Sequence, residues 1–260
     1  MSAVLVTGAS GTLGRAVLRR LLADGDLDEG HRVRALSRKP RTATGRETWV
    51  TGDLTTGAGI AEAVRDVDVV VHCATDVRRP KNDIAGTRHL LDALSATRSH
   101  LIYVSIVGID RVPLPYYKTK LAVEGLVERA DVPWTILRAT QFHDLARTMF
   151  QALARVPVMP LPAGMSLQPV DVTDVADRLA ELAAEPPRGR ATDLGGPQVR
   201  TLKDLARAYL TAEGKRRPIM GVRLPGAILR AYREGHHLTP EHADGRVTFE
   251  EYLCRRASGR

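Results

Sequence analysis

Short apolar runs rich in β-branched residues alternate with longer stretches of helical periodicity over the first 140 residues. The runs predict strands at 3–7, 31–37, 48–52, 67–74, 101–105 and 134–138, and the stretches between them predict helices at 12–23, 60–65, 82–96 and 116–130. The run at 67–74 is apolar almost throughout, as is typical of a strand buried on both faces of a parallel sheet. This alternation predicts an α/β fold with a Rossmann-type, doubly wound parallel sheet.

The regular alternation ends near Thr140, and the remaining chain predicts a smaller, mostly helical substrate region. Pro157, Pro160 and Pro162 predict a loop there, followed by helices at 172–184, 202–213 and 226–234. We therefore expect a dinucleotide-binding core at 1–140 and a substrate-binding cap at 141–260, interleaved as one structural unit. The polar tail from residue 235 onward ends in a hydrophobic anchor formed by Phe249, Tyr252 and Leu253.

Three glycines lie between the first predicted strand and the first predicted helix: Gly8, Gly11 and Gly14. Gly8 allows a tight turn, Gly11 allows close approach of a pyrophosphate, and Gly14 allows the helix and the strand to pack closely. The helix N-terminus then offers free N–H groups to an anion. The pattern predicts a dinucleotide site; a structural turn without a ligand is the alternative.

The end of the second predicted strand bears on the choice of cofactor. NAD sites usually carry a carboxylate about 20 residues after the glycine turn, which binds the ribose 2′-hydroxyl. Here the strand ends in Ser37, Arg38 and Lys39, without a carboxylate. A guanidinium suits the 2′-phosphate of NADP, so the sequence predicts NADP(H), and a solvated arginine is the alternative reading.

Composition narrows the function classes. The 260 residues carry a net charge of +8, and only 4% are aromatic, which argues against platforms that stack single-stranded nucleic acid. No apolar run approaches the ~20 residues that span a bilayer, and no signal peptide is evident. The two cysteines lack metal-ligand spacing, and His236, His237 and His242 fit a polar loop better than a metal site. We expect a cytoplasmic, metal-free protein that binds neither nucleic acid nor membrane, as a monomer or homodimer.

The segment from Thr7 to Gly14 resembles the TGxxGxxG turn of short-chain dehydrogenases/reductases in their extended and atypical branches. Gly52-Asp53-Leu54 and His72-Cys73-Ala74-Thr75 resemble segments of the same group, in the same order. The later stretches 137–143 and 168–176 resemble its NmrA-like, NAD(P)-binding subgroup. The resemblance implies that Asp53 contacts the adenine. Together with the turn and the second strand, it implies cofactor contacts from Gly8, Ser10, Gly11, Thr12, Leu13, Gly14, Ser37, Arg38, Asp53, Leu54, Cys73, Ala74, Thr75, Tyr116, Lys120 and Ala139.

Tyr116 and Lys120 resemble the YxxxK catalytic pair of the same group. Four residues apart on a predicted helix, they share a face. The resemblance implies that Lys120 holds the nicotinamide ribose and lowers the pKa of Tyr116, so that Tyr116 exchanges a proton with the substrate near neutral pH. It also implies that Ser105 binds the substrate oxygen. Tyr117 competes with Tyr116 for the pocket, although only Tyr116 has a lysine four residues later.

Gln141, Phe142 and His143 follow the sixth predicted strand and are candidates to contact the substrate; a buried, structural His143 is the alternative. The favoured function is an NADP(H)-dependent oxidoreductase of a small organic molecule, which reduces a carbonyl or oxidises an alcohol. A non-catalytic NADP(H)-binding redox sensor and an NAD(P)-dependent epimerase or dehydratase remain as alternatives.

Overall fold

The computed structural model describes residues 3–23, 32–43 and 45–258. It divides into two compact units, each assembled from separate segments of the chain. The first unit comprises Met1–Ser105, Pro115–Leu137 and Val175–Thr192, and the second comprises Ile106–Leu114, Arg138–Asp174 and Asp193–Arg260. Each unit therefore combines segments that are far apart in the sequence.

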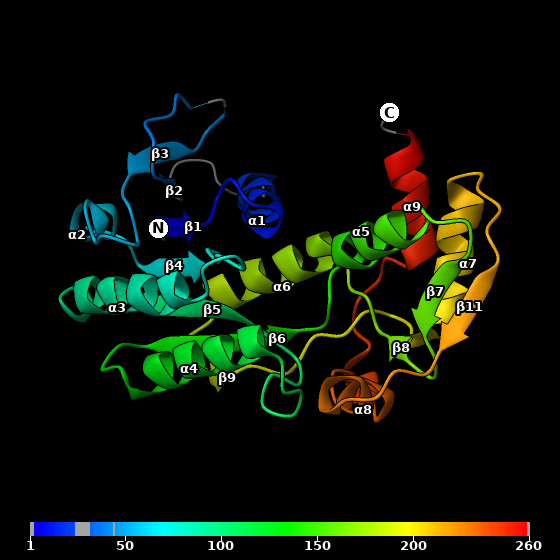
Figure 1. Cartoon of the computed structure of the whole chain (residues 1–260). Helices are drawn as coiled ribbons and strands as arrows, with labels where there is room; N and C mark the ends of the chain where they lie inside the picture. The colour runs from blue at the N-terminus through cyan, green and yellow to red at the C-terminus, as the bar shows by residue number, and fades with distance from the viewer. Residues whose placement is uncertain (1–2, 24–31, 44, 259–260) are drawn as a thin grey trace. The chain divides into compact units, whose positions relative to one another are not determined.

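A seven-stranded parallel sheet with the strand order β3-β2-β1-β4-β5-β6-β9 forms the centre of the first unit (Figure 1). Val4 of β1 pairs with Val33 of β2 on one side and with Val69 of β4 on the other. The doubly wound parallel sheet predicted from the sequence is confirmed. Its strands are β1 (Ala3–Thr7), β2 (Arg32–Ser37), β3 (Thr48–Thr51), β4 (Val69–His72), β5 (His100–Ile106), β6 (Trp134–Ala139) and β9 (Gly189–Arg190).

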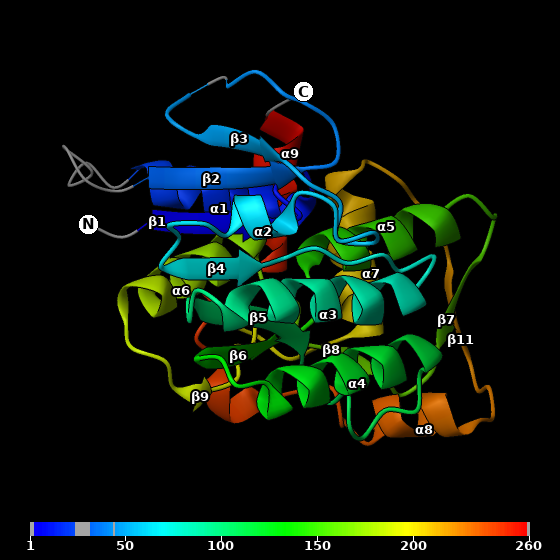
Figure 2. The same ribbon diagram turned by 90° about the vertical axis from the view of Figure 1, so that its left-hand side faces the viewer.

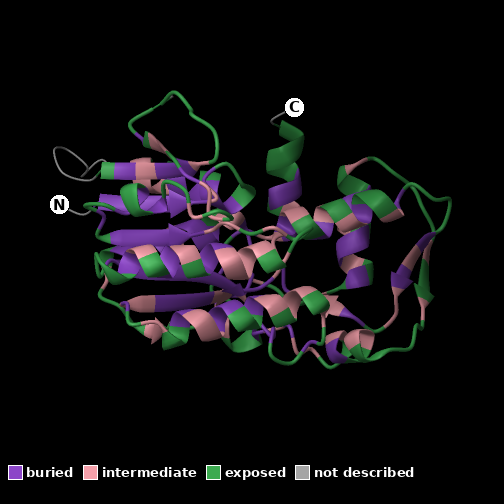
Figure 3. Ribbon diagram, turned by 60° about the vertical axis from the view of Figure 1, so that its left-hand side comes forward, coloured by how far each residue is buried: buried purple, intermediate pink, exposed green. Residues whose placement is uncertain are grey.

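Helices flank this sheet. Figure 2 shows α3 and α4 in front of the strands, and Figure 3 shows buried strands beside helices that are exposed on their outer faces. Leu5, Leu101 and Ile136 from the strands share one core with Leu90 of α3 and Val123 of α4. The helices of this unit are α1 (Thr12–Ala23), α2 (Ile60–Ala63), α3 (Lys81–Ser95), α4 (Pro115–Arg129) and α6 (Val172–Ala184). The first residues of α6 belong to the second unit.

Two strands of the sheet differ from the sequence prediction. The strand expected at 67–74 is shorter, because β4 spans only Val69–His72. Beyond His72, Ala74 N donates to the side chain of Thr7, at 3.3 Å from Oγ1, instead of to a neighbouring strand. Cys73, Ala74 and Thr75 therefore lie in a loop, which we call the β4 loop. The seventh strand, β9, is only two residues long, too short to give a periodic signal.

The second unit contains helices, two two-stranded sheets and an apolar core around Phe150, Tyr209 and Phe249. Phe249, Tyr252 and Leu253, the expected anchor, are buried. The elements are α5 (His143–Leu153), β7 (Met159–Pro162), β8 (Ser166–Leu167), β10 (Arg200–Thr201), α7 (Leu202–Ala212), β11 (Ile219–Val222), α8 (Ala227–Arg233), a 3-10 helix (Pro240–His242) and α9 (Phe249–Ser258).

The prediction of a loop around Pro157, Pro160 and Pro162 is wrong in its second half. Residues 159–162 form β7, which pairs in parallel with β11. Met159 N donates to Pro218 O at 2.8 Å, and Ala163 N donates to Val222 O at 3.0 Å. The prolines occupy alternate positions of a strand in a two-stranded sheet, where a missing N–H does not interrupt the ladder.

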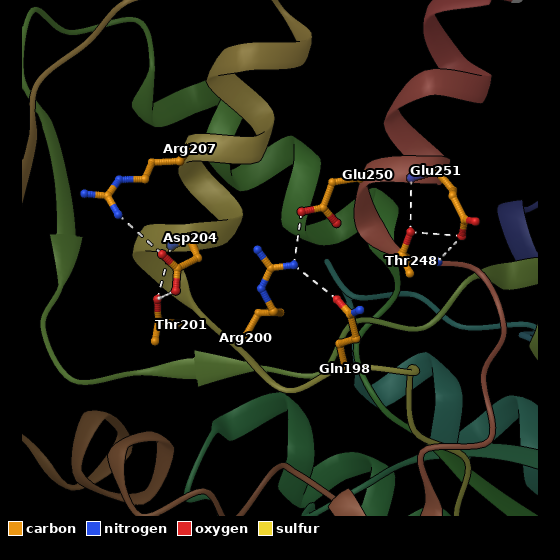
Figure 4. A network of polar contacts seen from close by, with 8 residues as sticks. All are labelled: Gln198, Arg200, Thr201, Asp204, Arg207, Thr248, Glu250 and Glu251. Atoms are coloured by element: carbon orange, nitrogen blue, oxygen red, sulfur yellow. Dashed lines mark hydrogen bonds and ion pairs between the residues drawn. The ribbon is translucent and has the colours of Figure 1, made fainter.

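Helices α5 and α9 were not predicted, although the start of α9 carries a recognisable signal. Figure 4 shows Thr248 and Glu251 in a capping box: Thr248 N donates to Glu251 Oε2 at 2.8 Å, and Glu251 N donates to Thr248 Oγ1 at 3.3 Å. Arg200 pairs with Glu250 of α9 at 3.0 Å in the same network. The polar composition of the tail conceals this short amphipathic helix. No helix within residues 3–23, 32–43 and 45–258 is long and apolar enough to cross a membrane.

Gln168 joins three backbone segments in the interior of the second unit, where it is fully buried. Its side-chain nitrogen donates to the carbonyl oxygens of Gly196 and Thr239, both at 3.0 Å. Its side-chain oxygen accepts a hydrogen bond from Thr239 N at 2.8 Å. One amide side chain therefore satisfies three buried backbone groups.

We expect Gln168→Leu to lower the free energy of unfolding by about 3 kcal/mol, because it leaves buried polar groups unpaired. Urea denaturation measures this loss. The matched control is Gln151→Leu on the exposed surface of α5, which should change stability by no more than about 0.5 kcal/mol. Similar losses in both variants would contradict the structural role of Gln168.

Candidate cofactor and catalytic site

The turn between β1 and α1 is shaped by the absence of side chains. Gly8 has φ +63°, and a Cβ there would lie 2.6 Å from Ala74 N. A Cβ on Gly14 would lie 2.7 Å from the carbonyl carbon of Gly8. Gly11 differs, because a Cβ there would meet only the Gly8 oxygen, at 3.1 Å. Gly8 and Gly14 are thus required by packing, whereas the backbone at Gly11 is open on its outer side.

This open side lies at the N-terminus of α1. Ser10, Gly11 and Thr12 are exposed there, whereas Leu13 is buried and holds the helix in the core. Exposed backbone N–H groups at a helix N-terminus attract anions. The turn therefore fits the pyrophosphate of a dinucleotide.

The ends of β2 and β3 form the second part of the site. Gly52 N donates to Ser37 O at 3.0 Å, which holds the end of β2 beside the segment that contains Asp53 and Leu54. The carboxylate of Asp53 accepts a hydrogen bond from Thr55 N at 2.8 Å. Arg38 is exposed and forms no ion pair with any residue that the structure describes. Its guanidinium is thus available to an anionic group.

The β4 loop connects the glycine turn to the interior. His72 Nδ1 lies 2.7 Å from Thr7 Oγ1, and its Nε2 lies 3.4 Å from Thr87 Oγ1. Burial, and then the charge of Lys120, lower the pKa of His72 to about 3, so this ring is neutral. Burial raises the pKa of the Cys73 thiol to about 12. These groups organise the backbone without carrying charge at neutral pH.

Tyr116 meets the β4 loop through its hydroxyl group. Its oxygen lies 2.8 Å from Thr75 Oγ1, and Thr75 donates to Asp83 Oδ2 at 2.6 Å. Burial raises the pKa of Tyr116, the hydrogen bond with Thr75 opposes this, and the charge of Asp83 raises it further. The expected lowering of this pKa by Lys120 is therefore not what the structure shows. Tyr117 is half-buried beside it, with the ring centroids 6.4 Å apart.

Lys120 is buried, with only 5% of its surface exposed. Its Nζ donates to Val104 O at 2.9 Å and lies 4.2 Å from the centre of the Tyr103 ring. Burial lowers the pKa of Lys120 to about 8, although Asp83, Glu124 and Cys73 oppose this effect. Ser105, at the end of β5, is also buried, and its hydroxyl has no hydrogen-bond partner among the described residues.

The structure places Thr7, His72 and Asp83 around the predicted glycines, Tyr116 and Lys120, and of these three Asp83 is the one that the sequence motifs did not include. Asp83 lies in the first turn of α3, where an acidic residue is an ordinary helix-stabilising feature. Its contact with Thr75 joins residues that are eight apart, and the contact of Thr75 with Tyr116 joins residues that are 41 apart. No periodic signal in the sequence reports such contacts.

The remaining predicted residues lie in the second unit. Ala139, at the end of β6, is buried, and its carbonyl accepts a hydrogen bond from Val107 N at 3.0 Å. Phe142 precedes α5 and forms a β-bridge with Val170, and the side-chain nitrogen of Gln141 is buried without a partner among the described residues.

His143 lies in the core of that unit, with 1% of its surface exposed. Its Nε2 lies 2.9 Å from Val247 O, and its ring stacks on Tyr252 at 5.1 Å. This placement favours the structural reading of His143 over substrate contact. His237 is similarly occupied, with its Nε2 2.9 Å from Ser166 O. Among the described residues, no group of three or more His, Cys, Asp or Glu side chains could hold a metal ion.

Comparison with known proteins agrees with the geometry of the turn. A protein family described as NAD(P)H-binding matches residues 8–186, which include the glycine turn, the β4 loop, Tyr116 and Lys120. This match confirms the resemblance to an NAD(P)-binding group that the sequence predicted.

Two curated relatives illustrate the range of functions. The photosystem II assembly factor Ycf39 of Cyanophora paradoxa is 30% identical over 152 residues, which cover 54% of this chain and 45% of that protein. The (4-alkanoyl-5-oxo-2,5-dihydrofuran-3-yl)methyl phosphate reductase of Streptomyces griseus is 29% identical over 210 residues, which cover 77% of this chain and 70% of the reductase. This chain thus matches less than half the length of the first relative.

The solved structure of the NADPH-dependent quinone oxidoreductase QOR2 of Escherichia coli, in complex with NADPH, has a similar fold. It superimposes with a TM-score of 0.81 over 97% of this chain and 99% of that chain, at 18% sequence identity. At this identity the likeness concerns the fold alone.

The burial of Lys120 predicts a pH-dependent contribution to stability. Its folded pKa of about 8 lies below the ordinary 10.5, so the unfolded chain binds more protons between these values and stability rises with pH in this window. Relative to Lys120→Met, the unsubstituted protein should gain up to about 3 kcal/mol in free energy of unfolding from pH 7 to pH 10.5. Urea denaturation at several pH values measures the difference.

The matched control is Lys118→Met, which removes an exposed lysine from the same helix and should give no such trend. A constant difference between the unsubstituted protein and Lys120→Met across this pH range would show that Lys120 is not buried as described.

Proposed function

Because the chain belongs to the NAD(P)H-binding family, we propose that it is an NADP(H)-dependent oxidoreductase that acts on a small organic molecule. The proposed reaction is reduction of a carbonyl group or oxidation of an alcohol, with Tyr116 as proton donor or acceptor. Ser105 and Lys120 complete the proposed catalytic group, and the glycine turn with Ser37, Arg38 and Asp53 forms the proposed cofactor site.

The observation that carries this proposal is the position of the β4 loop. The loop packs against the glycine turn so closely that a Cβ on Gly8 would lie 2.6 Å from Ala74 N. The next residue, Thr75, contacts the hydroxyl of Tyr116 at 2.8 Å. Three consecutive residues thus join the dinucleotide turn to a tyrosine hydroxyl, as an enzyme that couples a cofactor to proton transfer requires.

The chemistry divides between the cofactor and the protein. A bound, reduced nicotinamide supplies a hydride. Tyr116 then donates its proton to the oxygen of the carbonyl, and the unpartnered hydroxyl of Ser105 is free to donate a hydrogen bond to the same oxygen. The ammonium of Lys120 supplies positive charge one helical turn from Tyr116, which favours the phenolate that remains after transfer.

Arg38 supports NADP(H) rather than NAD(H) as the cofactor. It follows β2 directly, it is exposed, and it has no ion-pair partner among the described residues. A planar guanidinium binds a phosphate in two-pronged geometry, and no carboxylate at this strand end competes for a ribose hydroxyl.

A second candidate is a cofactor-binding role without turnover. The relative from Cyanophora paradoxa bears the name of an assembly factor rather than of an enzyme, which favours this reading for part of the family. Such a protein needs the glycine turn but not the proton chemistry of Tyr116. The two functions therefore differ in the expected effect of a change at Tyr116.

We expect Tyr116→Phe to reduce NADPH-dependent turnover of a carbonyl substrate at least about 100-fold, because the proton donor is lost. NADPH binding, measured by fluorescence titration, should be unchanged. A panel of quinones, aldehydes and ketones supplies the substrates. The matched control is Tyr117→Phe on the same helix, which should retain turnover; loss of turnover in this variant alone would assign the proton donor to Tyr117.

We expect Arg38→Gln to weaken NADPH binding by about 10- to 100-fold and to leave NADH binding unchanged, because a charge-assisted hydrogen bond is worth about 1.5–3 kcal/mol. Isothermal titration calorimetry measures both dissociation constants. The control is Arg41→Gln, which removes the same charge from a guanidinium that lies 5.0 Å from the Trp49 ring centre. Equal losses for NADPH and NADH would exclude a 2′-phosphate contact.

A further inference from the structure

Two hydrogen bonds connect Tyr116 to the carboxylate of Asp83, and their directions are fixed. Thr75 has one hydroxyl hydrogen, which it donates to Asp83 Oδ2 at 2.6 Å. In the 2.8 Å contact between Thr75 Oγ1 and the Tyr116 oxygen, Thr75 must therefore accept and Tyr116 must donate. The hydroxyl hydrogen of Tyr116 is held toward the β4 loop.

We propose that Asp83 is a positioning residue: by holding the hydrogen of Thr75, it leaves Tyr116 protonated, with the Tyr116 hydrogen directed to Thr75 until a substrate oxygen accepts it. The proposal rests on the function proposed above, in which Tyr116 is the proton donor. It goes beyond that function because Asp83, among the described residues, forms no hydrogen bond with the glycine turn or with Lys120 and acts on Tyr116 through Thr75.

Asp83 is itself held firmly. Its other oxygen, Oδ1, accepts a hydrogen bond from Asp76 N at 2.7 Å, so both oxygens accept, as in an ionised carboxylate. Asp76 in turn accepts hydrogen bonds from the backbone of Arg78 and Arg79 and from the side chain of Asn82. The segment from Thr75 to Asp83 is thus cross-linked by its own polar groups, and Thr75 has little freedom to turn away.

Thr75 can also stabilise the phenolate that Tyr116 becomes after it has donated its proton. When Tyr116 transfers its proton to a substrate oxygen, its own oxygen becomes an acceptor. The Thr75 hydrogen can then turn from Asp83 to the phenolate, so a hydrogen bond reverses while no covalent bond to Thr75 breaks. The proton that Tyr116 gave to the substrate is later replaced from water.

The charged and titratable groups around Tyr116 act in opposite directions. Asp83 on α3 disfavours the phenolate, and Lys120 on α4 favours it when protonated. Burial raises the pKa values of Tyr103 on β5 and of Cys73 in the β4 loop, so both are neutral at pH 7. Burial is the largest cause of the raised pKa of Tyr116, and Asp83 is the charged group in this set that acts in the same direction.

The test measures the titration of Tyr116 itself, without cofactor or substrate. The chain carries six tyrosines, so the protein is labelled with 13C at the tyrosine Cζ and the Tyr116 resonance is assigned from its loss in Tyr116→Phe. In Asp83→Asn the resonance should titrate at lower pH than in the unsubstituted protein. In Thr75→Val it should titrate at higher pH, because the Thr75 hydrogen bond lowers the pKa of Tyr116.

The matched control is Asp92→Asn, an exposed aspartate on the same helix, which should leave the titration of Tyr116 unchanged. The asparagine in Asp83→Asn still offers an oxygen to Asp76 N, so the fold should be retained, as a thermal melt verifies. An unchanged titration in Asp83→Asn would overturn the proposal. The double variant Thr75→Val/Asp83→Asn is also compared with Thr75→Val. If Asp83→Asn shifts the titration of Tyr116 as much in this background as in the unsubstituted protein, Asp83 acts by charge alone and the proposal is overturned.

Turnover measurements separate this proposal from the proposed function. If both hold, Asp83→Asn should lower kcat about tenfold with little change in KM, because the proton donor is less well oriented. If the titrations shift as expected but Tyr116→Phe retains full turnover, the positioning of Tyr116 stands and the catalytic function fails. If Tyr116→Phe abolishes turnover and Asp83→Asn leaves both titration and kcat unchanged, the function stands and the positioning role fails.

Discussion

The close approach of two backbone segments, the glycine turn and the β4 loop, determines the rest of the site. The space where a side chain of Gly8 would stand is filled by the backbone of Cys73 and Ala74, at 2.6–2.7 Å. Because the loop cannot move outward without losing the hydrogen bond from Ala74 N to Thr7, Thr75 is placed at a fixed distance from the turn. The position of Thr75 in turn fixes where the hydroxyl of Tyr116 lies, because the two oxygens are 2.8 Å apart.

Burial then sets the electrostatics around this framework. His72, Lys120 and Tyr103 lie in the apolar interior beneath the site, and burial is the largest influence on each of their pKa values. In each case it disfavours the charged form, whether cation or phenolate. The site therefore consists mostly of neutral donors and acceptors, beside which the carboxylate of Asp83 on α3 accepts a hydrogen bond at each of its oxygens.

Much of this fold was predictable from the sequence, and the reasons differ between elements. The strands and helices up to β6 are periodic or continuously apolar, so their positions were predicted to within about two residues, and the glycines and the Tyr116–Lys120 spacing are local patterns. The β7 strand was hidden by prolines, and α9 by a polar tail. The chain from Tyr116 to Thr75 to Asp83 depends on contacts across three elements, which no local pattern encodes.

The opposing charges near Tyr116 also bear on the direction of proton transfer. Oxidation of an alcohol by a tyrosine base requires the phenolate, which a protonated Lys120 would favour. The pKa of Lys120 is lowered to about 8, so this support weakens in the alkaline range where a phenolate would otherwise form. Burial and the charge of Asp83 disfavour the phenolate, and the opposing support from Lys120 weakens, so the site is arranged for donation to a carbonyl oxygen more than for removal of a proton from an alcohol.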